Sequence, residues 1–405
     1  ICDNCGSTMV KVGEEFVRTE VQFIPAKLKV IDHYRETYEC RSCRKNGTPY
    51  MEKAPVPYPP VLHSLASAST ITWLIHQKFE LSIPLYRQEK EWEALGLRLS
   101  RATMSNWLLI VYRDWLVHNV HRLKLELLKQ RYLHIDETHV QVLKEPGRKN
   151  TSDSYMWVYC SIRDAVNPIR YFEYQPGRSG KYPEAFLREY EGYIHTDAYS
   201  GYNAVSGVKR CLCYTHLRRA FVDALPKDIH NSEASKPAEA ILRLNQLFNL
   251  ESELEALPPD QKKKERLIRE KPLLEAFWSW AEKSAIGELP KSKLSKAFHY
   301  ALNNREGFWN YLEDGNCSIS NSLAENCIRP FVIGRKNWLF SGSPKGAEAS
   351  AGIYTLVQTA KANGLAPMKY IKYILSDMPG SAFLEHPEYL DDYLPWNPLV
   401  KEFCR

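Results

Sequence analysis

The sequence has no long apolar run, no internal repeat and no strong excess of charge of either sign. A membrane-spanning helix needs roughly 18 or more consecutive apolar residues, so we expect no membrane partner. The chain opens at Ile1 without a basic and then apolar leader, which favours a cytoplasmic protein, and the missing Met leads us to expect a fragment or a processed product. The net charge of +6, from 54 basic and 48 acidic residues, is too small to identify a nucleic-acid partner by itself.

Ten cysteines are present, but the chain is far longer than the small secreted proteins in which many cysteines indicate disulfides. Four of them form two close pairs near the start, Cys2-x-x-Cys5 and Cys40-x-x-Cys43. Each pair offers two thiolates to one tetrahedral Zn²⁺ ion, and four thiolates leave no open position for catalysis. We therefore predict a structural zinc site within residues 1–54, with unlinked thiols or disulfides as the alternative.

A proline-rich stretch at 55–60 predicts an extended linker, and the residues after it, 61–130, have helical spacing. A helix expected at 84–95 and a second at 101–115, capped by Ser100, have the proportions of a helix-turn-helix. The second helix of such a motif contacts bases with its first turns; an ordinary helical hairpin is the alternative. The candidate DNA-contacting residues there are Arg101, Ser105 and Asn106.

From residue 131 the periodicity changes from that of helices to that of strands. Strand and helix patterns then alternate up to residue 225, which predicts a mixed α/β sheet. A helical block interrupts this region over 226–315, and the region resumes over 316–376. We expect strands at 132–136, 140–142, 155–162, 169–174, 193–197 and 210–213, with helices at 183–190 and 216–225.

Two aspartates lie in or at the end of expected strands. Asp136 follows Ile135 and precedes Val140, and Asp197 ends the strand that contains Ile194. A buried, unpaired carboxylate costs several kcal/mol, so we expect a metal or another cation to compensate each one. A single such aspartate is usually a cap or an ion-pair partner, whereas two on strands expected to be neighbours indicate a shared site.

Glu325 is the third acidic candidate, on an expected helix whose buried face includes Leu323 and Ile328. Three hard oxygen ligands suit Mg²⁺ or Mn²⁺ and not Zn²⁺. Two such ions about 4 Å apart hold the attacking and leaving oxygens of an in-line phosphoryl transfer. We therefore interpret Asp136, Asp197 and Glu325 as both the catalytic and the metal-binding residues.

Charge is distributed unevenly near the carboxyl end. Residues 325–372 contain seven Lys or Arg against two Glu, and residues 377–405 contain six acidic residues against two basic ones. The basic segment is suited to hold a phosphate backbone. Its candidate DNA-contacting residues are Arg329, Arg335 and Lys336.

Two features of the same end have open interpretations. Trp338 and Phe340 either stack on an unpaired base or pack in the core. The acidic tail is rich in proline, so we expect it to be irregular, with Asp391 and Asp392 among aromatic residues. It is either a plain packing arm or a segment that lies across the basic region and competes with DNA.

Four strings in the chain resemble the carboxylate regions of DDE transposases. The string at 134–138 resembles the strand of the first aspartate, and the string at 196–202 resembles that of the second. The strings at 325–330 and 334–343 resemble the region of the third carboxylate. Their combination is similar to bacterial transposases of the insertion-sequence sixty-six family, over nearly the whole chain.

This resemblance implies an α+β multidomain transposase that carries out metal-dependent strand cleavage and strand transfer at element ends, in the bacterial cytoplasm with the nucleoid. It implies catalytic Mg²⁺ or Mn²⁺, structural Zn²⁺ and small accessory proteins of the same element. Because two DNA ends must be joined, we expect a homodimer on DNA. The expected parts are a zinc finger at 1–54, a helical DNA-binding domain at 61–130, an RNase H-like mixed α/β catalytic domain at 131–225 and 316–376, an all-helical insertion at 226–315 and an acidic tail at 377–405.

Cys213-x-x-His216 resembles a Cys-His pair that follows the second aspartate in several DDE families. From the residues alone, the pair is half of a metal site with Cys211 or a packed turn before a basic helix. Arg218 and Arg219 follow it and are further candidates for DNA contacts. The resemblance makes Cys213 and His216 possible accessory residues of the active site.

Two rival functions remain open at this point. A tyrosine recombinase would need an Arg/His cluster around one nucleophilic tyrosine, and none of the 24 tyrosines stands out in this way. A catalytically inactive zinc-finger DNA-binding regulator, derived from a transposase, would tolerate the loss of all three carboxylates. Metal-dependent nicking of DNA distinguishes the transposase from both.

Overall fold

The computed structural model describes residues 1–24, 26–226 and 235–405. It divides into two compact units, one of Ile1–Val56 with Ala94–Leu97, the other of Pro57–Glu93 with Arg98–Arg405. Residue 25, in the expected zinc finger, and residues 227–234, at the start of the expected insertion, lie outside the described residues. Within the described ranges, no helix has both the length and the apolarity to cross a membrane.

The first unit contains one small hairpin. Strand β1 (Thr37–Glu39) pairs antiparallel with β2 (Met51–Lys53), and helix α1 (Arg41–Lys45) lies between them in the chain. Cys40 is the N-cap of α1 and Cys43 lies inside it, so the second cysteine pair is in this β-α-β segment.

The sheet of the second unit has the strand order β5-β4-β3-β6-β7. Strands β3 (Tyr132–Val142), β4 (Asp153–Ser161) and β5 (Arg170–Gln175) form an antiparallel meander, whereas β6 (Gly192–Thr196) and β7 (Val208–Leu212) run parallel to β3. The two strands expected at 132–136 and 140–142 are one continuous strand, because the polar residues between them pair with β4 as well. Strand β8 (Phe340–Ser341) pairs in parallel with the end of β3.

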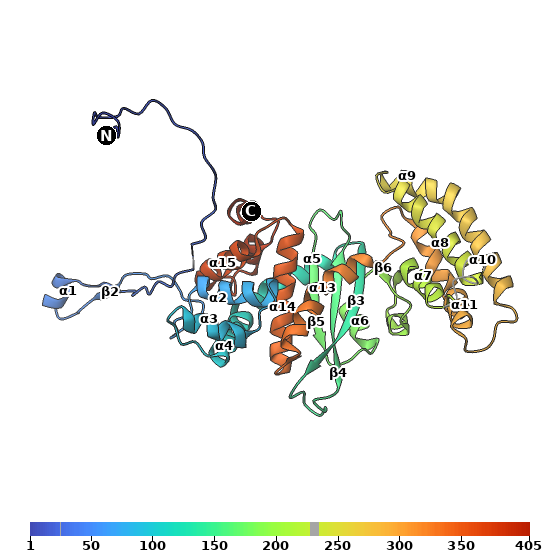
Figure 1. The fold of residues 1–405 in the computed structure, drawn as a ribbon. Coiled ribbons are helices and arrows are strands. Elements are labelled where there is room, and N and C mark those ends of the chain that lie inside the picture. Colours follow the sequence, from blue (N-terminus) through green and yellow to red (C-terminus); the bar gives the residue numbers. More distant parts are fainter. Residues whose placement is uncertain (25, 227–234) are drawn as a thin grey trace. The chain divides into compact units, whose positions relative to one another are not determined.

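Helix α14 (Pro344–Ala362) lies along the β5 edge of this sheet (Figure 1). An edge strand leaves backbone N–H groups unpaired, and here two threonines of α14 satisfy them. The hydroxyl of Thr355 accepts from Phe172 N at 2.8 Å, and that of Thr359 accepts from Arg170 N at 3.1 Å. The helix thus closes the edge of the sheet as well as covering it.

Helices from three parts of the sequence surround the sheet region. Before β3, Ser100 caps α4 as predicted, since its hydroxyl accepts from Thr103 N at 3.1 Å. In this part, two single π-helical turns interrupt the α-helices. The elements before β3 are α2 (Ala68–Ile75), η1 (His76–Glu80), α3 (Leu85–Ala94), α4 (Arg101–Val111), η2 (Tyr112–Leu116) and α5 (Val117–Leu128).

The insertion between β7 and the last helices is helical where it is described, as predicted (Figure 1, yellow). Its core joins that of α7 (Tyr214–Val222) through an aromatic cluster around Phe221, Phe277 and Trp278. Its elements are α8 (Lys236–Glu253), α9 (Pro259–Glu265), η5 (Arg266–Glu270), α10 (Lys271–Ala285), α11 (Lys293–Asn303), α12 (Arg305–Trp309) and η6 (Asn310–Glu313).

The expectation of an irregular tail is wrong. After α15 (Pro367–Asp377), the chain forms short 3-10 turns and a final helix, α16 (Pro398–Cys404), because Phe383, Tyr393 and Val400 are buried. Asp391 accepts from Arg122 of α5 at 2.6 Å, a contact that supports the packing-arm interpretation of the tail.

Candidate active site

The pairing of β3 with β6 brings the two strand aspartates to neighbouring positions. His134 of β3 is in register with His195 of β6, and Asp136 and Asp197 each lie two residues further on. Side chains at paired positions of parallel strands project from the same face of a sheet. Asp197 is the first residue after β6, so it lies at the edge of the sheet, where strands end and loops begin.

The loop after β6 is held by Arg210 of β7. Its guanidinium donates to the hydroxyl of Thr196 at 2.7 Å and to the carbonyls of Asp197 and Tyr199 at 2.5 and 2.8 Å. Within the loop, the Asp197 carboxylate accepts from Tyr199 N at 2.9 Å. These bonds leave the Asp197 side chain in one orientation at the end of the strand.

Glu325 lies in the first turn of α13 (Ser322–Trp338), and Asn321 anchors the start of that helix to β3. The Asn321 amide donates to Ile135 O at 2.8 Å, and its oxygen lies 3.1 Å from His134 Nδ1. Helix α13 therefore starts against the residue that precedes Asp136. Its last turn carries Arg335 back to β3, where the guanidinium donates to the Thr138 hydroxyl at 3.0 Å.

The electrostatics of Asp136 connect the three predicted carboxylates. Burial, followed by repulsion from the nearby Glu137, Asp197 and Glu325 carboxylates, raises the pKa of Asp136 to about 7. Like charges raise a carboxyl pKa only when they are close, so Asp197 and Glu325 both lie near enough to Asp136 to repel its charge. A divalent cation among them would relieve both the desolvation and the repulsion.

Cys213 and His216 lie beside Glu325. One ligand atom from each of the three residues lies within 4.8 Å of the others, and His216 Nδ1 is 3.7 Å from Glu325 Oε1. Both of these atoms are buried without a hydrogen-bond partner. The neighbouring Cys213 side chain, and then the charges of Glu325 and Asp197, raise the pKa of His216. The Cys-His pair is therefore at the carboxylate site, and Cys211 is not part of this group.

Cys211 belongs to a second group, with His195 and Cys317, whose ligand atoms also lie within 4.8 Å of one another. Here both histidine nitrogens are engaged: Nε2 accepts from Ser318 N at 2.9 Å, and Nδ1 lies 3.1 Å from Leu133 O. A nitrogen that already has a hydrogen-bond partner is a poor metal ligand, so we assign this buried group a structural role.

The sequence alone assigned no role to three residues of this region, which are Glu137, Arg178 and Asn321. Glu137 lies on the opposite face of β3 from Asp136 and forms an ion pair with Arg178 at 2.6 Å. Arg178 in turn covers the Tyr199 ring at 3.9 Å, so it links β3 to the loop that bears Asp197. Asn321 is the third, and only its position four residues before Glu325 could have indicated it.

The predicted DNA-contacting residues have different surroundings. Arg101, Ser105 and Asn106 are exposed at the start of α4, and Arg329 and Lys336 are exposed on α13. Three other arginines are engaged: Arg218 donates to Asn245 at 2.8 Å, Arg219 lies 3.9 Å from Glu325, and Arg335 binds β3.

The four predicted zinc ligands form two local pairs. Hydrogen bonds from Ser7 lower the pKa of Cys5, and hydrogen bonds from Cys43 lower that of Cys40, so both turns favour thiolates. Among the described residues, the groups of His, Cys, Asp and Glu close enough for one ion do not include these cysteines. The donor type fits Zn²⁺, and ligation by all four residues stays a prediction.

Comparison with protein families gives two matches. Residues 63–349 match the model described as "Transposase IS66 family", and residues 1–44 match the "zinc-finger binding domain of transposase IS66". Among curated proteins, the chain is similar to three uncharacterized proteins of Sinorhizobium fredii, each aligned over 98% of this chain. They are y4hP (26% identical, 73% of its length), y4jD (26%, 78%) and y4qI (28%, 73%).

Proposed function

Because this chain belongs to the IS66 family of transposases, we propose that Asp136, Asp197 and Glu325 hold divalent cations and that the chain cuts and joins DNA strands with them. The single observation that carries the proposal is the parallel pairing of β3 with β6, with His134 in register with His195, so that Asp136 and Asp197 each follow two residues later on neighbouring strands. On this proposal, three acidic groups far apart in the chain share one site at the edge of the sheet, where uncompensated charge is costly.

The ligand chemistry favours a hard cation. Carboxylate oxygens suit Mg²⁺ and Mn²⁺, and the proposal covers both. Bound cations would activate the attacking water or 3′-hydroxyl and stabilise the leaving 3′ oxygen of an in-line phosphoryl transfer. Arg219, 3.9 Å from Glu325, is in reach of a phosphate at the same place.

The sheet supports an RNase H-like interpretation of the catalytic domain. An antiparallel meander of three strands is followed by two strands parallel to the first, with the first aspartate on the central strand. The carboxyl ends of parallel strands are a common place for active sites in α/β sheets, and Asp197 lies at such an end.

We also propose how the chain binds DNA and how many copies act together. The zinc-finger and transposase domains imply DNA binding. We propose that Cys2, Cys5, Cys40 and Cys43 bind Zn²⁺, that α3 and α4 form the predicted helix-turn-helix, and that two copies act together on DNA. Small accessory proteins of the same element stay a further prediction.

Strand cleavage tests the proposal. Asp136→Asn, Asp197→Asn and Glu325→Gln each remove one charge with little change in shape, and each should lower Mg²⁺- or Mn²⁺-dependent nicking of element-end DNA by about 1,000-fold or more. Asp223→Asn is the matched control, because Asp223 is an exposed carboxylate at the end of α7. DNA binding, measured without divalent metal, should survive in all four variants.

Two outcomes favour the rivals. Unchanged nicking, or no nicking by the wild type in any divalent metal, fits the inactive regulator. A covalent phosphotyrosine adduct fits a tyrosine recombinase. Tyr199 is the tyrosine closest in chain to the carboxylates, and its hydroxyl already donates to Arg178 O at 2.7 Å.

A further inference from the structure

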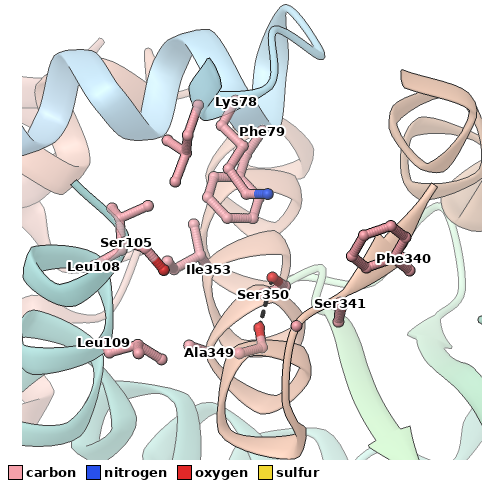
Figure 2. Close-up of a pocket in the computed structure, with 13 residues that line it drawn as sticks. Lys78, Phe79, Ser105, Leu108, Leu109, Phe340, Ser341, Ala349, Ser350 and Ile353 are labelled. Carbon is pink, nitrogen blue, oxygen red and sulfur yellow. Dashed lines mark hydrogen bonds between the residues drawn. The ribbon is translucent and has the colours of Figure 1, made fainter. Parts of the chain in front are cut away.

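A cavity lies between α4, η1, α14 and β8, and none of the three carboxylates lines it. Its volume is about 110 Å³, and Figure 2 shows the side chains that line it, with Leu108 and Leu109 on one side of Ala349 and Ser350, and Phe340 on the other. Its walls are mixed: Phe79, Leu108 and Ile353 contribute apolar surface, whereas polar atoms, including the hydroxyls of Ser105, Ser341 and Ser350, line the larger part of it. Pockets for whole small molecules usually measure several hundred Å³, so this one suits a single flat group.

Lys78 supplies the one cation among the residues that line the cavity. Its Nζ lies 4.3 Å from the centre of the Trp338 ring and 5.3 Å from that of Phe79, and none of the ion pairs among the described residues includes it. Lys78 is half-buried, and its burial lowers the pKa of the ammonium to about 8. The residue lies in the π-helical turn η1, and such turns frequently occur at functional sites.

Phe340 is a large apolar residue at the mouth of this cavity. It is 44% exposed, and the preceding Leu339 is 64% exposed and has a φ of 68°. A positive φ costs of order 1 kcal/mol for a side chain such as leucine, and strain of this kind clusters at functional sites. The strained residue ends α13 and turns the chain so that Phe340 pairs with β3 as β8.

The rim of the cavity continues into the predicted DNA-contacting helix. Ser105 lines the cavity and is exposed at the start of α4, on the same helix as Arg101 and Asn106. Lys345 and Lys336 are exposed on the helices that flank β8. A polyanion that follows these cations would pass the mouth of the cavity, where the Lys78 ammonium has no carboxylate partner among the described residues.

We propose that this cavity receives a single unpaired base of the DNA, which stacks on Phe340 and accepts a hydrogen bond from the Lys78 ammonium. The proposal rests on the proposed function only in that DNA is the substrate. Every base presents a flat face for stacking, and ring nitrogens and carbonyl oxygens are acceptors for lysine. Taking a base out of the stack is cheapest where it is already unpaired, so the cavity should favour DNA that contains such a base.

The test is a binding measurement with the full zinc-loaded chain in buffer without added Mg²⁺ or Mn²⁺, so that no strand is cut and the zinc stays bound. The probes are two 30-base-pair duplexes of one sequence, one fully paired and one with a single unpaired thymine in the middle. Wild type should bind the duplex with the unpaired base about tenfold more tightly, because one stacked base contributes roughly that much affinity. Lys78→Met and Phe340→Ala should each reduce this preference to less than about threefold.

Two matched control variants distinguish binding in the cavity from general electrostatic attraction to DNA and from general apolar contact with it. Lys345→Met removes an exposed cation that does not line the cavity, so both probes should weaken together and the preference should persist. Phe403→Ala removes an exposed phenylalanine, 60% exposed on α16, and should change neither affinity. Melting temperatures within about 2 °C of wild type check that the variants fold.

Two results overturn the inference: equal affinity of wild type for both probes, or a preference that survives both Lys78→Met and Phe340→Ala. Because no cleavage is involved, either result leaves the carboxylate proposal standing. Conversely, a preserved preference in a chain that never nicks DNA would overturn the carboxylate proposal and leave the cavity assignment intact.

Discussion

Two groups of cysteine, histidine and neighbouring residues lie near the carboxyl end of β7, and they differ in their hydrogen bonding. In the group of His195, Cys211 and Cys317, both ring nitrogens of the histidine have partners. In the group of Cys213, His216 and Glu325, the buried Nδ1 of the histidine and Oε1 of the glutamate have none. Satisfied polar groups stabilise a fold, whereas unsatisfied buried ones indicate a ligand that completes them.

The two groups together position the third carboxylate, Glu325. Ser318 N donates to His195 and Asn321 N donates to Cys213, at 2.9 and 3.1 Å, so both groups anchor the segment that leads into α13. The structural group holds the segment in place, and the second group places Glu325 next to His216. Four variants test this division of roles, and they follow in order of decreasing expected effect.

His195→Ala should destabilise the fold most. His195 is 1% exposed and stacks on His134 with ring centres 4.2 Å apart. Removing the ring loses this packing and leaves the half-buried Ser318 N–H without its acceptor, at a cost of about 3 kcal/mol. The melting temperature of the full chain should fall by roughly 6–10 °C. A fall of less than 2 °C would refute the structural assignment.

His216→Ala should instead lower activity without lowering stability. The imidazole is only partly buried and makes no hydrogen bond through Nδ1, so little packing is lost. Loss of a group that positions Glu325 should slow metal-dependent nicking by about 100-fold and raise the metal concentration needed for half-maximal nicking. Equal nicking by His216→Ala and wild type across a metal titration would remove His216 from the site.

The stability of the metal-free chain should depend on the ionisation of Asp136. Its folded pKa of about 7 lies above the usual aspartate value, so the unfolded chain loses the proton first and stability falls as pH rises from about 4 to 7. Asp136→Asn removes this penalty, so it should stabilise the metal-free chain by roughly 2 kcal/mol at pH 8 and by little at pH 4.

Denaturant unfolding of both chains at the two pH values measures this difference. Added Mn²⁺ should stabilise wild type at pH 8 more than it stabilises the variant, because a bound cation compensates the carboxylate. A variant that is less stable than wild type at pH 8 without metal would contradict the assigned repulsion.

Changes at the zinc finger should have the smallest effect on the sheet unit. Cys40→Ser should remove the bound zinc, measured as metal content, because a structural site needs all four ligands. The melting temperature of the unit of Pro57–Glu93 and Arg98–Arg405 should move by less than about 1 °C. Unchanged zinc content would contradict ligation by Cys40.

Local patterns in the sequence predict much of this fold. The change of period at residue 131 correctly indicates the sheet, and Ser100 caps α4 as its type predicts. The tail was misjudged because its prolines suggested irregular structure, whereas tertiary burial of Tyr393 and Val400 orders it. Pattern alone does not report such burial, because the partners lie far away in the chain.

The residues of the candidate site also differ in how far the sequence predicts them. Asp136 and Asp197 could be paired from their strand positions, since strands of one sheet bring their residues into register. The residues that hold these two aspartates in place could not be predicted from the sequence. Asn321 contacts Ile135 and Arg210 contacts the Asp197 loop only after folding, and neither residue type in its local sequence is unusual.

Replacing the catalytic cation with Fe²⁺ tests most directly whether Asp136, Asp197 and Glu325 bind the same ion. With ascorbate and peroxide, a bound Fe²⁺ ion produces hydroxyl radicals that cut the backbone next to its ligands. Cuts near residues 136, 197 and 325 of the same chain, suppressed by excess Mg²⁺ and absent from Asp136→Asn, are the predicted result. Cuts at only one of the three positions, or cuts unaffected by Mg²⁺, would show that the three carboxylates do not share a cation.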